Sequence, residues 1–218
     1  MRMIWAAAAL AAAIVGAAAA EESAETARYR VEIQLDWTPA RHPLDYPQNA
    51  HFSRVIGTTH TSRYALFRDG DTASSGFALV ATNGRTSVLE AELAEAMRRR
   101  RVGAVFFAPA LNAGSGTVRA EFEATERHAL VSFATMLAPS PDWITGVASV
   151  PLRAEGAWVA RIEAPLWVWD AGADSGETYA AKNAETQPRQ SVRLLATPHA
   201  LTPDGLQGVG RAVFTRLE

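Results

Sequence analysis

The chain of 218 residues contains no cysteine. Disulfide bonds therefore do not stabilise the fold, and thiolate metal sites and thiol redox chemistry are excluded. The same absence excludes a lipoprotein anchored through a modified cysteine. No Asn-x-Ser/Thr glycosylation acceptor occurs, and Lys182 is the single lysine. The formal net charge of −2 is not typical of a polyanion-binding protein, so we expect no nucleic-acid partner.

Common catalytic motifs are missing as well. The sequence has no His-Glu-x-x-His and no Gly-x-Ser-x-Gly pattern, and the lysine of a phosphate-binding loop is absent. The five histidines are His42, His51, His60, His128 and His199. No two of them have the spacing of metal ligands on one helix face, and His51 and His60 are interpreted as hydrogen-bonded loop residues rather than zinc ligands. These absences predict that the protein is not an enzyme.

The first 20 residues have the pattern of a signal peptide. Arg2 supplies a positive charge, residues 4–15 are apolar, and Ala18-Ala19-Ala20 forms a small-residue cleavage site before Glu21. An uncleaved membrane anchor is the alternative, because residues 3–20 are marginally long enough to span a bilayer. We expect a secreted or periplasmic protein with no transmembrane segment in the mature chain. Residues 21–28 are predicted to be a disordered spacer and residues 29–218 a single domain.

Apolar and polar residues alternate without a break from Tyr29 to Trp37, which is the pattern of a β-strand with one buried face. The next stretch, residues 38–52, carries three prolines and is expected to be an ordered loop. Further strands are expected at residues 63–67, 102–107, 118–123, 129–137, 158–162, 192–194 and 212–217. Short strands separated by glycine- and proline-containing turns predict an all-β protein with an antiparallel sandwich or barrel.

One helix is expected, from Ser87 to Arg101. Ser87 and Glu90 have the spacing of a capping box, and an apolar stripe runs along the helix. The stripe consists of Leu89, Leu93 and Met97. The four arginines at residues 98–101 are interpreted as a solvated helix C-terminus rather than a binding patch. The apolar run at residues 76–81, which stops at the turn signal Asn83-Gly84, is not assigned to a helix.

Two segments concentrate aspartate, glycine, proline and tryptophan. The first, Pro139-Ser140-Pro141-Asp142-Trp143, follows a predicted buried strand, and its prolines favour a rigid extended loop. The second runs from Trp167 to Gly176, and its two glycines permit a tight turn that directs Asp170 and Asp174 toward one point. Carboxylates brought together repel one another unless a cation lies among them, and calcium suits oxygen ligands. On spacing alone, each cluster is also typical of an ordinary turn.

The order and spacing of these two segments resemble the signature of the spondin domain. Residues 42–47, 51–53, 56–60 and 73–76 are also similar to the N-terminal half of that family. The resemblance is strongest over residues 29–200, nearly the whole predicted mature chain. It implies a C2-like antiparallel β-sandwich, here with one short helix, that binds calcium.

In the spondin-domain family the ion is held by the aspartate of the first motif and both aspartates of the second. These correspond to Asp142, Asp170 and Asp174, with backbone carbonyls and water completing the six to eight ligands that calcium takes. Ala173 replaces a threonine that is common in the family, and the cysteines of animal members are missing. The resemblance implies a binding or adhesion module whose partner is an unknown extracellular protein or glycan. A metal-dependent hydrolase that uses the same aspartates is the alternative.

Three tryptophans flank the aspartates, namely Trp143, Trp167 and Trp169. Aromatic rings beside a calcium site can stack on sugars or insert into a membrane surface. They can equally pack the end of the sandwich and brace its loops, and this is the interpretation we favour.

Overall fold

A computed structural model describes residues 25–202 and 205–217. The predicted signal peptide and residues 21–24 lie outside the described residues, so cleavage before Glu21 stays a prediction. Among the described residues, no helix is both long and apolar enough to cross a membrane. The elements are β1 (Thr26–Asp36), β2 (His51–Phe52), β3 (Val55–His60), α1 (Ser75–Asn83), α2 (Ser87–Arg98), β4 (Val102–Ala108), β5 (Ser115–Thr125), β6 (Leu130–Ala138), β7 (Trp143–Pro151), β8 (Arg153–Ala154), β9 (Ala157–Trp158), β10 (Arg161–Asp170), β11 (Arg193–Leu194), β12 (Leu201–Thr202), β13 (Gly205–Leu206) and β14 (Gly210–Leu217).

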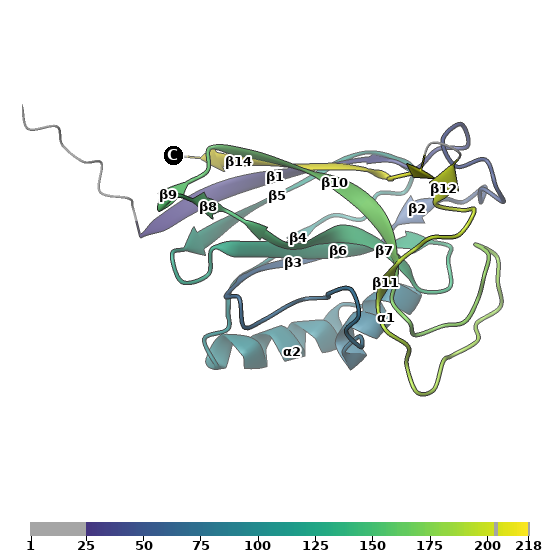
Figure 1. Ribbon diagram of the computed structural model, residues 1–218, viewed down its shortest axis with the longest axis horizontal. Helices are drawn as coiled ribbons and strands as arrows, with labels where there is room; N and C mark the ends of the chain where they lie inside the picture. Colours follow the sequence, from purple (N-terminus) through teal and green to yellow (C-terminus); the bar gives the residue numbers. More distant parts are fainter. Residues whose placement is uncertain (1–24, 203–204, 218) are drawn as a thin grey trace, which may run out of the picture.

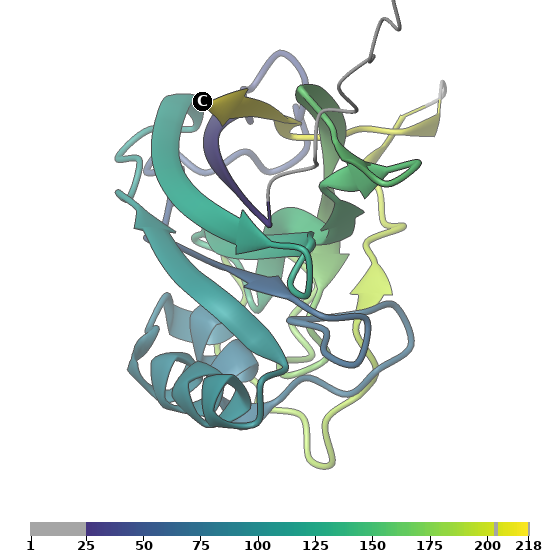
Figure 2. The same cartoon turned by 90° about the vertical axis from the view of Figure 1, so that its left-hand side faces the viewer.

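The main sheet folds over into two facing layers, with the helices outside one of them (Figures 1 and 2). Its strand order is β4-β3-β6-β7-β10-β14-β1-β5, with β2 beside β6 and β11 beside β10. Strand β10 belongs to both layers, because residues 161–166 pair with β14 whereas residues 167–170 pair with β7. All these pairings are antiparallel. The predicted all-β antiparallel sandwich is confirmed.

The upper layer in Figure 1 consists of β5, β1, β14 and the first part of β10, and the lower layer of β4, β3, β6 and β7. Strand β1 lies inside the upper layer, between β14 and β5. Its inward side chains Tyr29, Val31 and Ile33 are fully buried, and each such burial stabilises the fold by about 1.5–3 kcal/mol. The strand begins at Thr26 and pairs with β5 from that residue onward. Residues 26–28 are therefore not the disordered spacer predicted from the sequence, because Ala27 continues the buried side of the alternation.

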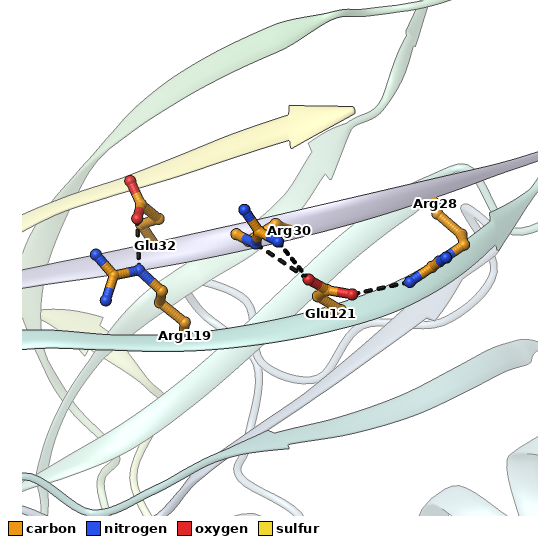
Figure 3. Close-up of polar contacts among 5 residues, drawn as sticks. All are labelled: Arg28, Arg30, Glu32, Arg119 and Glu121. Atoms are coloured by element: carbon orange, nitrogen blue, oxygen red, sulfur yellow. Dashed lines mark hydrogen bonds and ion pairs between the residues drawn. The ribbon is translucent and has the colours of Figure 1, made fainter. Parts of the chain in front are cut away.

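The outer face of this upper layer carries a lattice of ion pairs across strands (Figure 3). Glu121 of β5 accepts hydrogen bonds from Arg28 and Arg30 of β1, at 2.9 and 2.7 Å. Arg119 of β5 pairs with Glu32 of β1 at 2.5 Å. Exposed pairs of this kind are screened by solvent and contribute little to stability. Their main consequence is a solvated, charged face on this part of the sheet.

Two helices, rather than the single predicted one, cover the outer face of the lower layer (Figure 1). Helix α1 begins after Ser74, whose hydroxyl accepts a hydrogen bond from the amide of Phe77 at 3.1 Å. Glu92 of α2 accepts hydrogen bonds from the Gly76 amide and the Ser74 hydroxyl, at 2.8 and 2.6 Å. A Cβ at Gly76 would lie 2.5 Å from the backbone of Leu89, so glycine permits this close helix contact.

Helix α2 confirms the predicted helix but ends three residues earlier. Leu89 and Leu93 are buried as expected, whereas Met97 is 43% exposed. The residue that precedes the helix is Thr86, not Ser87, and its side chain makes no capping hydrogen bond to the backbone. Arg98 and Arg99 both pair with Glu95, in agreement with a solvated helix C-terminus.

Other local predictions need correction. Residues 63–67 form no strand and lie in the connection that leads to α1. Residues 158–162 are divided between β9 and the start of β10. The short hairpin β8–β9 reverses the chain before β10 begins. The alternation in residues 158–162 therefore spans two elements instead of one strand.

His60 lies in strand β3 and is fully buried, so its interpretation as a loop residue is wrong, although it is hydrogen-bonded as expected. Its Nδ1 donates to the Thr61 carbonyl at 2.9 Å, and its Nε2 accepts from the Ser132 hydroxyl at 2.7 Å. The Ser132 oxygen in turn accepts from the Ser149 amide at 2.8 Å. Burial lowers the pKa of His60, which favours this neutral tautomer.

Candidate functional site

The two aspartate motifs meet where β7 begins and β10 ends. Trp143, the first residue of β7, is the direct partner of Asp170, the last residue of β10. The Asp142 carbonyl accepts a hydrogen bond from the Ala171 amide at 3.2 Å. Asp174 lies in the loop that follows β10, where it forms an isolated antiparallel bridge with Glu185. The antiparallel pairing of β7 and β10 thus brings together two motifs that are about 30 residues apart in the sequence.

Asp142 is fully buried, and its two carboxylate oxygens have different surroundings. The Oδ2 atom accepts hydrogen bonds from the amides of Ala173 and Asp174, at 2.6 and 3.0 Å. The Oδ1 atom is buried, and no group of the described residues makes a hydrogen bond to it. Burial, followed by the negative charge of Asp170, raises the pKa of Asp142 from 3.8 to about 6, although the two amide hydrogen bonds oppose this rise. Asp142 is therefore a carboxylate whose charge is poorly compensated.

Asp170 and Asp174 have more complete sets of partners. Asp170 accepts from the Gly172 amide at 2.8 Å through Oδ1 and from Arg193 at 3.0 Å through Oδ2. Asp174 accepts from the amides of Gly176 and Ala184, both at 2.8 Å. These bonds fold the 171–192 loop back on itself. The sequence prediction that the glycines allow a tight turn fits Gly172, whose φ of +69° is in the left-handed region.

The fit of this cluster to a metal ion is partial. Among the described residues, no group of three or more histidine, cysteine or acidic side chains is already arranged around one ion position. The unpartnered Asp142 Oδ1 is the atom that would most readily accept a cation, because buried polar atoms rarely lack a partner. The Oδ2 atom of Asp170 could bind a cation only after its ion pair with Arg193 had broken. The three carboxylates are near enough for their charges to interact, as a shared cation requires.

Two of the three flanking tryptophans, Trp143 and Trp169, pack against other aromatic rings. Trp143 is buried, and its ring lies 5.0 Å from that of Tyr179 and 5.2 Å from that of His199. The ring centroid of Trp169 lies 5.6 Å from that of Phe67. Phe67 belongs to a second hydrophobic core, which lies between the helices and the sheet. Packing of the end of the sandwich is therefore confirmed for Trp143, whereas the half-buried Trp169 packs against this second core.

Sequence reasoning missed two residues that shape the site, Arg193 and His199. The predicted strand at residues 192–194 contained a signal for the first: Val192 and Leu194 alternate with Arg193, and in the structure Arg193 is the cross-strand partner of Asp170. No short motif marks His199, because its contacts come from segments distant in sequence. Both residues line a pocket beside Asp170 and Asp174.

Comparison with known proteins supports the resemblance of the two motifs. The Spondin_N family model matches residues 27–204. Spondin-2 of Rattus norvegicus is 36% identical over 170 residues, which cover 76% of this chain and 52% of that protein. Spondin-1 of Bos taurus is 36% identical over 208 residues, which cover 88% of this chain and 25% of that protein. The chain thus spans about half the length of spondin-2 and a quarter of spondin-1. From the extent of the family match and these identities, we conclude that the chain belongs to the Spondin_N family.

Proposed function

We propose that the mature protein is an exported calcium-binding module that binds a partner molecule and does not catalyse a reaction. The observation that carries the calcium proposal is the buried Oδ1 atom of Asp142, which has no donor and lies within the electrostatic influence of two further carboxylates. A calcium ion here would compensate these charges. It would also connect the segment before β7 with the loop after β10.

The proposed ligands are Asp142, Asp170 and Asp174. Asp142 has Oδ1 available, and the Asp174 oxygens can each accept a further contact because a carboxylate oxygen carries two lone pairs. Asp170 becomes available when Arg193 turns away. The Arg193 side chain is 62% exposed, so it can be solvated after leaving Asp170, and a pair of this kind is weak. Calcium would thus replace an arginine as the partner of Asp170.

Family membership supports a binding role in the periplasm or outside the cell. The partner is proposed only by class, as an extracellular protein or glycan, because the chain matches only part of each longer relative. The hydrolase alternative uses the same carboxylates. Ester, phosphate and glycoside substrates, assayed with and without calcium, test it directly. If the wild type turns over one of these substrates and Asp170→Asn does not, the protein is an enzyme and the proposed binding role is wrong.

Calorimetric titration with calcium tests the site. Extracellular calcium modules often have dissociation constants of about 10⁻⁴ to 10⁻³ M, so 1 mM calcium should stabilise the protein by roughly 0.4–1.4 kcal/mol. Asp170→Asn removes one charge at nearly constant size and should weaken binding. Asp69→Asn is the matched control, because Asp69 is exposed in a surface turn outside the site. No binding by the wild type, or equal affinity in all three proteins, would exclude the proposed site.

A further inference from the structure

A pocket of about 630 Å³ lies beside the aspartate cluster. One wall is the loop at residues 174–178, and the other is the segment at residues 193–199. The volume is within the range of about 300–1,000 Å³ found for small-ligand sites. Leu195 and Pro198 supply apolar surface, and Glu177 adds an exposed carboxylate to the lining.

Two side chains in this lining have buried polar atoms that make no hydrogen bond within the part of the chain that the structure describes. His199 is only 8% exposed, and neither of its ring nitrogens makes a hydrogen bond. The Thr197 hydroxyl is also buried without a partner. Buried polar groups are nearly always hydrogen-bonded, so two such residues in the lining of one pocket indicate a ligand with complementary polar atoms.

The surroundings of His199 determine what it can do for that ligand. Its Nε2 atom lies 3.6 Å from the Asp45 carboxylate, which favours the tautomer that carries the proton on Nε2. Nδ1 is then left as a hydrogen-bond acceptor. The rings of Trp143 and Tyr179, with centroids 5.2 and 5.0 Å away, hold the imidazole in place. The pocket wall therefore contains a fixed acceptor.

The charge of the pocket favours a cation. Three acidic residues and one arginine line it, which gives a formal charge of −2 with His199 neutral. The arginine, Arg193, is already paired with Asp170, so the uncompensated charge belongs to Asp174 and Glu177. An ammonium group has three donors and no acceptor. It can therefore be matched by Glu177, the Thr197 hydroxyl and His199 Nδ1.

We propose that this pocket binds a primary ammonium group at the end of an alkyl chain, as in a lysine side chain of a protein partner. The alkyl chain would lie against Leu195 and Pro198, and the ammonium group would interact with Glu177 and Thr197. This inference rests on the proposed binding function, because it names the chemistry of the partner. It does not require that calcium binds.

Calcium-free protein titrated with the neutral-ended peptide acetyl-Gly-Lys-Gly-amide provides the test, with NMR chemical-shift changes as the readout. A single side chain in an open pocket should bind with a dissociation constant on the order of 10⁻³ M. The same peptide with norleucine or glutamate in place of lysine should bind at least about tenfold more weakly, since it lacks the charge-assisted hydrogen bonds. Glu177→Gln and Thr197→Val should each weaken lysine binding, the first by about five- to tenfold. Glu123→Gln, on the exposed side of β5, should have no effect.

Thermal unfolding of each variant establishes that it is folded before it is titrated. Equal binding of the lysine and norleucine peptides overturns the proposal, as does lysine binding that neither pocket variant changes. A lysine peptide that does not bind at all overturns this inference alone, because the calcium titration is a separate measurement. Conversely, if calcium does not bind, the titration with the lysine peptide still tests the pocket, because it is performed without calcium.

Discussion

Replacement of Asp142 by asparagine should make the calcium-free protein more stable at alkaline pH. The substitution keeps one oxygen to accept hydrogen bonds from the amides of Ala173 and Asp174. It replaces the unpartnered ionised oxygen with a neutral NH₂ group, which can donate toward the carboxylates that surround it. The variant therefore removes a buried charge without removing the hydrogen bonds that position the loop.

The size of the effect follows from the pKa of Asp142, which rises from 3.8 to about 6 on folding. A rise of about two units corresponds to about 3 kcal/mol between the protonated and ionised forms. Because the folded-state pKa is the higher one, the folded protein binds the proton more tightly. Its stability is therefore greatest below pH 4 as far as this group is concerned, and falls as the pH rises through about 6. Above that pH, Asp142→Asn should exceed the wild type by up to about 3 kcal/mol.

Urea unfolding in a chelator at pH 4.5, 6 and 8, followed by tryptophan fluorescence, measures this difference. The advantage of Asp142→Asn should be small at pH 4.5 and largest at pH 8, whereas Asp69→Asn should show no such trend. Excess calcium should reduce or reverse the advantage at pH 8, because the wild type then gains a cation that the variant binds poorly. A variant that is less stable than the wild type by the same amount at every pH would refute the reasoning about the buried charge.

Three further perturbations test other parts of the molecule. Ser132→Ala removes the donor to His60 Nε2 and should destabilise the fold by about 1–3 kcal/mol in urea unfolding; an unchanged midpoint would contradict this. Gly76→Ala should separate α1 from the Leu89 backbone and cost about 1–3 kcal/mol, measured in the same way, and a neutral result would show that the helices adjust freely. N-terminal sequencing of the exported protein should begin at or near Glu21, and a full-length chain held in the inner membrane would be inconsistent with cleavage.

The features predicted most accurately from sequence are those in which one side of an element is buried. Strand β1 has this property throughout, and its alternation is visible without any knowledge of its neighbours. Helix α1 was missed because it is buried on more than one side: Gly76, Phe77, Ala78, Val80 and Ala81 are all buried. Such a segment is apolar nearly throughout, so it shows no helical period.

The candidate site shows the same limit for polar residues. Asp142, Asp170 and Asp174 could be grouped because they lie in two recognisable motifs. The hydrogen bonds that now surround them come from backbone amides of the loop, and the ion pair comes from Arg193, 23 residues beyond Asp170. Nothing local in the sequence specifies how the carboxylate oxygens are distributed among these donors. Likewise, the bond between His60 and Ser132 joins residues 72 positions apart.

The pairing of β1 with β14 has a mechanical consequence. Arg28 lies opposite Leu217, so both ends of the domain leave the sandwich side by side, at the end remote from the aspartate loops (Figure 1). A tensile force applied through these two ends would load the backbone hydrogen bonds between β1 and β14 one after another, beginning at that pair, instead of all together. The domain should therefore unfold at low force by stepwise separation of β1 from β14. Strand β7 and the aspartate end of β10 should carry no force until that separation is complete.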